Sequence, residues 1–231
     1  MEEKLINWFG PIWREALGDY LKSPEFFSIG RQITEIRKTT EVFPKGENVF
    51  RIFKELSIDN VSVVLLGLDP FPNSSACGHS FCNCEALKLS PSLKYIIQEI
   101  NEEYPETIDR FVMPGGGLST WDLTYLVKQG VFLYNVALTV EKSKPESHLE
   151  LWKPFTKRVI EELNKQEFLT YILLGKKAQE YESIINPKHV CIKADHPSYH
   201  NYSPNAKFIG SGVFRKVNYQ LNKMGKQEIE W

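Results

Sequence analysis

Four short apolar runs rich in β-branched residues divide the chain, and segments with helical spacing lie between them. The runs cover residues 61–66, 131–133, 170–174 and 190–192. Apolar runs of this length, without strict alternation, are typical of strands buried in a parallel sheet. Strands that alternate with helices predict an α/β fold with a four-stranded, mainly parallel central sheet flanked by helices.

Two of the intervening segments carry clear helical signals. Ser90-Pro91-Ser92 places a capping residue and a proline before an apolar face that continues to Ile100. Residues 152–163 carry a second apolar stripe at steps of three and four. The 231-residue chain has no repeat and no Gly/Ser-rich linker, so we expect residues 1–231 to form one domain.

A polar or unusual residue follows each apolar run, close to where the strand should end. These residues are, in chain order, Asp69, Asn135, Gly175 and His196. Ligands of open α/β sheets bind beyond the carboxyl ends of the strands. The pattern therefore predicts a functional site at this edge of the sheet.

Each of these residues also has a structural interpretation. Asp69 lies in a tight Gly/Pro loop, where it could cap backbone amides, and His196 before a proline could be an ordinary loop residue. A buried asparagine such as Asn135 either satisfies backbone groups or binds a ligand, because an unpaired buried amide is costly. Any one motif is weak, and only their combination is specific.

In combination, the order and spacing of the motifs resemble the family 1 uracil-DNA glycosylases. That family has a Gly-Gln-Asp-Pro-Tyr-His motif, a Leu-Leu-Asn strand end and a His-Pro-Ser-Pro-Leu-Ser loop. This chain has Gly67-Leu68-Asp69-Pro70-Phe71-Pro72, Leu133-Tyr134-Asn135 and His196-Pro197-Ser198. The resemblance extends from about residue 42 to residue 231. It implies a base-excision repair enzyme that flips deoxyuridine out of DNA, hydrolyses the bond between base and sugar, and leaves an abasic site.

The resemblance also implies a role for each motif. Asp69 would stabilise the oxocarbenium-like sugar and orient water, and His196 would donate a hydrogen bond to the charge developing on uracil O2. Asn135 would accept from uracil N3–H and donate to O4, a pattern that cytosine reverses. Phe81 would stack on the base, and Phe71 would exclude the methyl group of thymine.

Further contacts to the substrate follow from the same resemblance. Leu68 would contact uracil largely through its backbone amide. The expected contacts to DNA phosphates and backbone are Ser90, Pro91, Ser92, Gly175 and Ser198. Such contacts must be local, because a formal net charge of −1 provides no global positive field. We expect single- and double-stranded DNA containing uracil as the substrate, and a monomer without cofactor or metal. A protein inhibitor of glycosylases is a further expected partner.

The chain departs from the family pattern around the predicted catalytic aspartate. Leu68 replaces glutamine, Phe71 replaces tyrosine and Pro72 replaces histidine. An aliphatic residue and a proline at these positions are similar to the poxviral glycosylases, so the departures are compatible with activity.

The residue that would wedge into the duplex stays open. After Ser198 the chain reads Tyr199-His200-Asn201 in place of Pro-Leu-Ser. His200 is the candidate by register, and Tyr199 or Tyr202 by bulk.

Cys77, His79, Cys82 and Cys84 form a cluster of soft ligands that could bind zinc or an iron–sulfur cluster. Their spacing is not a Cys-x-x-Cys pair with a distant partner pair, and Phe81 lies in the same stretch. We therefore favour buried or partly exposed thiols over a metal site. The N-terminal segment lacks the features of a signal peptide, and no apolar run is long enough to span a bilayer, which predicts a cytoplasmic protein.

Two other functions remain as alternatives. One is a glycosylase for a 5-substituted uracil, and the other is a catalytically weak DNA-binding or replication-accessory protein on the same scaffold. A protein kept only to bind DNA has no chemical need for the residue set Asp69, Phe81, Asn135 and His196. The complete set therefore favours the uracil-removing enzyme.

Overall fold

The computed structural model describes residues 5–83, 90–106 and 123–231. At its centre is a four-stranded sheet with the order β3-β2-β5-β6, in which every neighbouring pair is parallel. The strands are β2 (Val63–Gly67), β3 (Val131–Asn135), β5 (Thr170–Leu174) and β6 (Val190–Ala194). A separate antiparallel ladder joins β1 (Val42–Phe43) to β4 (Val140–Glu141). The predicted α/β fold with a four-stranded central sheet is confirmed.

Two strands extend beyond their predicted ends, because backbone pairing continues past the apolar residues. β3 continues to Asn135 and β6 to Ala194, because these residues still pair with Gly67 and Leu174 of the neighbouring strands. The apolar pattern also overstates the burial of β6. Only Ile192 of its five residues is buried, whereas all five residues of β3, the other edge strand, are buried.

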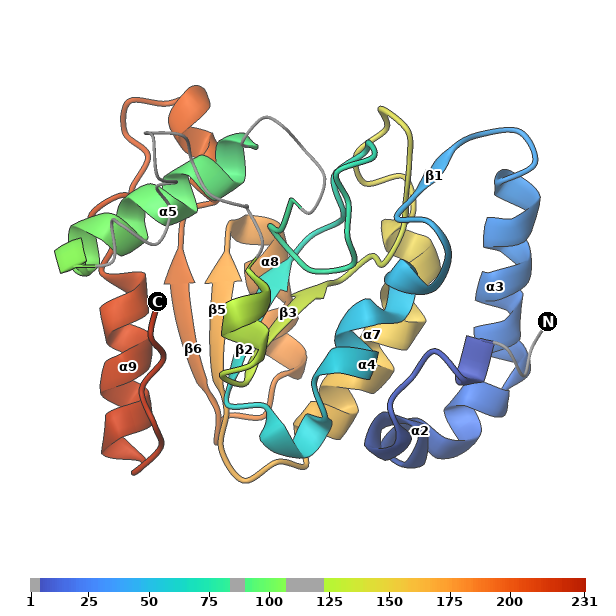
Figure 1. Ribbon diagram of the computed structural model, residues 1–231, viewed down its shortest axis with the longest axis horizontal. Helices are drawn as coiled ribbons and strands as arrows, with labels where there is room; N and C mark the ends of the chain where they lie inside the picture. The colour runs from blue at the N-terminus through green and yellow to red at the C-terminus, as the bar shows by residue number, and fades with distance from the viewer. Residues whose placement is uncertain (1–4, 84–89, 107–122) are drawn as a thin grey trace.

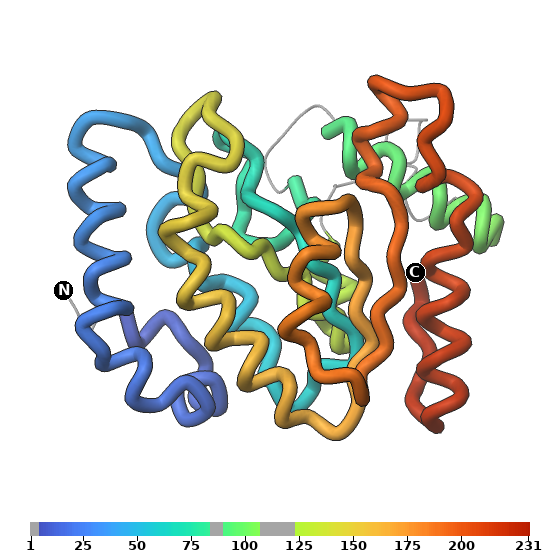
Figure 2. The backbone as a smooth tube through the Cα atoms, turned by 180° about the vertical axis from the view of Figure 1, so that it is seen from behind, coloured from blue at the N-terminus to red at the C-terminus, as the bar shows by residue number. Residues whose placement is uncertain are grey.

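Helices surround the sheet. The α-helices are α2 (Pro11–Leu17), α3 (Pro24–Ile36), α4 (Arg51–Glu55), α5 (Pro91–Glu103), α6 (Thr124–Val127), α7 (Leu149–Leu163), α8 (Lys176–Gln179) and α9 (Val213–Lys223). The 3₁₀ helices are η1 (Gly18–Lys22), η2 (Gly46–Phe50), η3 (Ile58–Asn60), η5 (Glu180–Ile184) and η6 (Pro197–Asn201). In Figure 1 the strands point toward the edge where α5 and η6 lie, and α3 and α9 stand at opposite ends of the sheet. Figure 2 shows the molecule from behind, with α7 and the segment that contains α8 in front of the strands.

Both predicted helical segments are confirmed. Ser90 caps α5 by accepting a hydrogen bond from the backbone N–H of Leu93 at 3.3 Å, with Pro91 at the first helical position. The predicted stripe of α7 is buried at all four positions, Trp152, Phe155, Val159 and Leu163. None of the described helices has the length and apolar character needed to cross a membrane.

Helix α7 also fixes the strand that leads into the predicted site, through Thr156. The hydroxyl groups of Tyr134 in β3 and Thr156 in α7 are hydrogen-bonded at 2.7 Å, and Thr156 donates to the carbonyl of Val136. Both side chains are fully buried, so these bonds are shielded from water. The end of β3, and with it Asn135, is thereby held against a rigid helix.

Candidate active site

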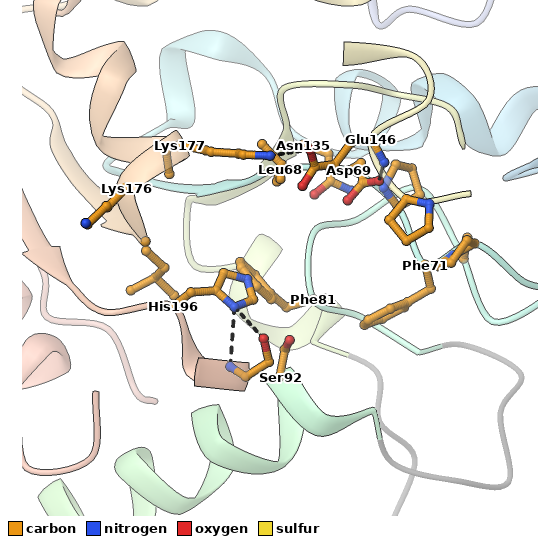
Figure 3. A pocket seen from close by; sticks show the side chains of 18 of the residues that line it. Leu68, Asp69, Phe71, Phe81, Ser92, Asn135, Glu146, Lys176, Lys177 and His196 are labelled. Carbon is orange, nitrogen blue, oxygen red and sulfur yellow. Dashed lines mark hydrogen bonds and ion pairs between the residues drawn. The ribbon is translucent and has the colours of Figure 1, made fainter. Parts of the chain in front are cut away.

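A cavity of about 560 Å³ opens at the carboxyl edge of the sheet. Its walls come from the loops after β2, β5 and β6, the end of β3, the loop before α7, and the first turn of α5. In Figure 3, Asp69 and Glu146 lie on one side of the cavity, and His196 and Phe81 lie next to each other on another. The structure thus brings together in one cavity residues that are distant in the chain, such as Asp69 and His196, which are 127 positions apart (196 − 69).

Asp69 is held by a backbone amide from a distant loop. The N–H of Glu146 donates to Asp69 Oδ2 at 2.6 Å. Burial raises the pKa of Asp69 above its ordinary value, whereas this hydrogen bond and the charge of Lys177 oppose the rise. The negative charge of the Glu146 carboxylate raises the pKa of Asp69 further. Glu146 also forms an ion pair with Lys177 at the mouth of the cavity. Asp69 is therefore a partly desolvated carboxylate with a fixed orientation.

Asn135 is the last residue of β3 and lies opposite Gly67 of β2. Its side chain lines the cavity with only 6% of the residue exposed, and in the described part of the chain its amide has no hydrogen-bond partner. A Cβ atom at Gly67 would lie 2.3 Å from Asn135 Oδ1, so only glycine leaves room for this amide. A buried amide with free donors and acceptors is suited to binding a polar ligand.

His196 has a defined tautomer. The backbone N–H of Ser198 donates to His196 Nδ1 at 3.3 Å, and the Ser198 hydroxyl lies 2.8 Å from the same nitrogen. Since a backbone N–H can only donate, Nδ1 carries the lone pair and the neutral ring carries its proton on Nε2. Burial lowers the pKa of His196 below its ordinary value, which favours the neutral form.

Gly175 provides the space for this histidine. Its φ of +84° lies in the region that favours glycine, and a Cβ atom there would lie 2.8 Å from His196 Cβ. Besides its predicted contact with DNA, Gly175 therefore leaves the space that the His196 side chain occupies.

Two predicted base-binding aromatic side chains line the cavity. Phe81 is nearly buried, adopts a φ of 60°, and has its ring centroid 6.0 Å from that of His196. Phe71 is half-buried and lies on the same side as Asp69. Leu68 also lines the cavity, and its carbonyl accepts from the N–H of Ala137 at 2.9 Å.

The predicted DNA contacts occupy several kinds of position. Ser92, Gly175 and Ser198 line the cavity. Ser90 and Pro91 begin α5 outside it, and the Ser90 hydroxyl caps the helix.

The side chains of the three wedge candidates differ in exposure and packing. Tyr202 is 81% exposed and lines the cavity, and Tyr199 is 47% exposed outside it. His200 is half-buried, because its ring stacks on Tyr95 at 5.0 Å and its Nε2 accepts from the N–H of Ile209 at 3.0 Å.

Sequence patterns did not indicate the charged residues at the cavity mouth. Glu146, Lys176 and Lys177 all line the cavity. Glu146 has a φ of 68°, a left-handed conformation that no glycine or asparagine signals in the sequence. Lys176 and Lys177 follow Gly175 directly, so a basic pair after a strand end was the one available signal.

The cysteine-rich stretch is buried beside the cavity. Cys77 donates through Sγ to the carbonyl of Cys82 at 3.4 Å, and both thiols are buried. His79 Nε2 bonds to Glu55 Oε2 at 2.9 Å, which lowers the pKa of Glu55 to about 2. Cys84 lies outside the described residues.

Known proteins are similar to this chain in both sequence and fold. The Uracil DNA glycosylase superfamily matches residues 53–222. A uracil-DNA glycosylase of Bacillus cereus strain G9842 is 37% identical, with 100% of this chain and 98% of the relative covered. A uracil-DNA glycosylase of Proteus mirabilis strain HI4320 is 35% identical, with 95% of each chain covered. The crystal structure of mimivirus uracil-DNA glycosylase shares the fold, with a TM-score of 0.82 at 24% identity, covering 98% of this chain and 88% of that one. On these similarities, the chain belongs to the uracil DNA glycosylase superfamily.

Proposed function

We propose that this chain is a uracil-DNA glycosylase of the family 1 type, which flips deoxyuridine from DNA and hydrolyses its glycosidic bond. The observation that carries the proposal is the buried Asn135 amide, which has no hydrogen-bond partner among the described residues and lines a cavity that also contains Asp69 and His196. The acceptor and donor of that amide match N3–H and O4 of uracil. Relatives named uracil-DNA glycosylase that align along nearly the whole chain support the same function.

The reaction needs charge stabilisation at both ends of the breaking bond. The C1′–N1 bond breaks with its electron pair leaving on uracil, and water adds to C1′ and loses a proton. Asp69, as a carboxylate, stabilises the positive sugar and orients or deprotonates this water. His196 donates from Nε2 to the negative charge that develops on uracil O2. The acceptor role of Nδ1 supports this assignment, because it leaves the proton on Nε2.

Base choice follows from the shape and polarity of the cavity. Phe81 provides a stacking surface, which is worth about 1–3 kcal/mol for a base. Phe71 lies against C5 of uracil and excludes thymine, and the backbone of Leu68 contacts the base. A glycosylase for a 5-substituted uracil would need room at Phe71, so its half-buried ring favours uracil.

DNA is held by local contacts. Ser90, Pro91, Ser92, Gly175 and Ser198 contact phosphates and backbone on either side of the extruded nucleotide. For the wedge, the exposure of Tyr202 at the cavity mouth supports this residue, and the packing of His200 on Tyr95 weighs against His200.

The proposal extends to partners and location. The structure of a variant of the mimivirus enzyme in complex with UGI, with a TM-score of 0.83, supports a proteinaceous inhibitor as a partner of this chain too. Activity on both single- and double-stranded DNA, a monomeric state and a cytoplasmic location remain predictions from the sequence.

A gel assay tests the proposed activity. A labelled oligonucleotide with one uracil is incubated with the protein in chelator and then treated with alkali. We expect free uracil, an intact strand before alkali and a cut strand after it. Strand cleavage without alkali, or a requirement for zinc, would contradict the proposal. Tight binding of the same DNA without uracil release would instead favour the accessory-protein alternative.

A further inference from the structure

The segment from Asp195 to Gly212 connects β6 to α9 and contains His196, η6 and Tyr202. We call it the His196 loop. Two bonds close the loop on itself. Lys207 N–H donates to Asp195 Oδ2 at 2.8 Å, and Ile209 N–H donates to His200 Nε2 at 3.0 Å. Neither bond fixes the loop relative to the rest of the cavity.

Helix α5 provides that attachment through two side chains one turn apart. Tyr95 stacks on His200, with ring planes 30° apart, and its hydroxyl donates to Asn201 Oδ1 at 3.1 Å. The same helix is capped by Ser90, and its residue Ser92 lines the cavity. One rigid element therefore contacts both the loop and the cavity.

Glu99 makes the second attachment and is fully buried. Its Oε2 accepts from Gly210 N–H at 2.6 Å, and its Oε1 accepts from Gly212 N–H at 2.8 Å and from the Ser211 hydroxyl at 3.0 Å. Gly210 and Gly212 have φ values of +76° and +67°, so the backbone curls around the carboxylate. A buried carboxylate with three donors is a strong anchor, because removing it leaves those donors unpaired.

We infer that Tyr95 and Glu99 are positioning residues for excision from duplex DNA, because they clamp the His196 loop to α5. The inference rests on the proposed role of this loop in holding the duplex open. A paired nucleotide must be pushed out of the stack, and a loose loop would transmit little of that force. A single-stranded substrate has no stack to open, so it depends less on the clamp.

Glu103 supplies a matched control on the same helix. Its carboxylate faces that of Glu99 and accepts from the backbone N–H groups of Phe214 and Arg215, in the first turn of α9. Among the described residues, its hydrogen bonds go to α9 and to Glu99 and not to the His196 loop. Glu103→Gln thus perturbs a buried carboxyl at the same helix junction without releasing the loop.

The test compares duplex and single-stranded substrates under single-turnover conditions at fixed salt. For Glu99→Gln we expect a fall of about tenfold in the rate on a U·A duplex and less than about threefold on a single strand. Tyr95→Ala should behave in the same way, and Tyr95→Phe, which keeps the ring, should lose less. Glu103→Gln should leave the duplex-to-single-strand ratio unchanged. Equal losses on both substrates in Glu99→Gln and Tyr95→Ala would overturn the inference.

Limited trypsin digestion gives a readout that is independent of uracil release. Lys207 is exposed, but the next residue, Phe208, is fully buried, so cleavage after Lys207 requires the loop to open. Cleavage there should be faster in Glu99→Gln and Tyr95→Ala than in the wild type and Glu103→Gln. Unchanged cleavage would overturn the clamp even if the excision rates changed. If the wild type releases no uracil, the proposed function fails, and the digestion still decides whether the clamp exists. Tyr95→Ala keeps the test valid if Glu99→Gln does not fold.

Discussion

The Asp69 side and the His196 side of the cavity are held in different ways. Beside Asp69, the carbonyls of Gly67 and Leu68 accept hydrogen bonds from residues that follow Asn135, so backbone pairing extends past the ends of β2 and β3. Beside His196, an 18-residue loop (195–212) depends largely on side chains, including those of Tyr95 and Glu99.

This difference predicts which substitutions affect chemistry and base choice and which affect excision from duplex DNA. Substitutions on the Asp69 side leave the backbone frame in place and should change chemistry or base choice on any DNA. Substitutions in the His196 loop or its clamp should change how the enzyme handles a duplex. His196 itself is the exception, because it lies in the loop but acts on the base in the proposed mechanism.

The largest effects are expected at the two proposed catalytic residues. Asp69→Asn and His196→Ala should each lower the single-turnover rate by about 10²–10⁴-fold, since both remove stabilisation that exists mainly in the transition state. The loss should be the same on single- and double-stranded DNA. Binding to DNA with an uncleavable uracil analogue should change much less. Near-normal turnover in either variant would remove that residue from the mechanism.

Base recognition should respond next. Asn135→Asp removes the donor to O4, so uracil excision should fall by about 10²–10³-fold while cytosine becomes relatively more acceptable. Phe71→Ala should open room for the methyl group of thymine. Competition assays with U-, C- and T-containing oligonucleotides measure both changes. Unchanged selectivity in both variants would mean that other residues form the base pocket.

The wedge prediction separates the two sides most directly. Tyr202→Ala should slow excision from a U·A duplex by about three- to tenfold and leave the single-strand rate nearly unchanged. His200→Ala should also act on the duplex, but by releasing the loop from Tyr95. The salt concentration must be fixed, because phosphate contacts are strongly salt-dependent. If Tyr202→Ala leaves duplex excision unchanged, Tyr202 is not the wedge.

A smaller effect is expected from the ion pair that bridges the cavity mouth. Activity should be lost as the pH falls through the pKa of Asp69, because the carboxylate is the active form. The charge of Lys177 lowers that pKa, so Lys177→Ala should move the acid limb of kcat/KM to higher pH. Lys176→Ala, one residue away and also exposed, is the control and should leave the limb in place. If Lys177→Ala lowers kcat/KM at every pH without shifting the acid limb, Lys177 acts in DNA binding alone.

The smallest effect concerns stability. Burial raises the pKa of Glu103 from 4.5 to about 7, and the neighbouring Glu99 adds to this rise. A raised carboxyl pKa stabilises the fold at low pH, and that contribution is lost as the pH rises from about 4.5 to about 7. Glu103→Gln removes the ionisation but also replaces one of the two oxygens that accept from Phe214 and Arg215 with an NH2 group, which costs stability at every pH. The pH-dependent part is the test: from pH 4 to pH 8 the Tm of the variant relative to the wild type should rise by about 2–4 °C. A Tm difference that does not change with pH would contradict the assignment.

The sequence was sufficient for the α/β class, the four strands, the capped start of α5 and the buried stripe of α7. These features depend on local periodicity and capping, which are determined by residues close together in the sequence. It also located Asp69, Asn135 and His196 at strand ends, because parallel strands bring their carboxyl ends to one edge. The resemblance then suggested a role for each of them.

Only the tertiary structure decided how these residues are supported. The tautomer of His196 depends on Ser198 folding back onto Nδ1, and Asp69 is oriented by the N–H of Glu146 from a loop 77 residues away. His200 looked like the wedge by register, but its ring is packed against Tyr95 on a helix 105 positions (200 − 95) earlier in the chain. No periodicity encodes such contacts, because they join segments that are distant in sequence and become neighbours only when the sheet has formed. Local pattern therefore determined which groups reach the site, and long-range packing determined which of them are free to act.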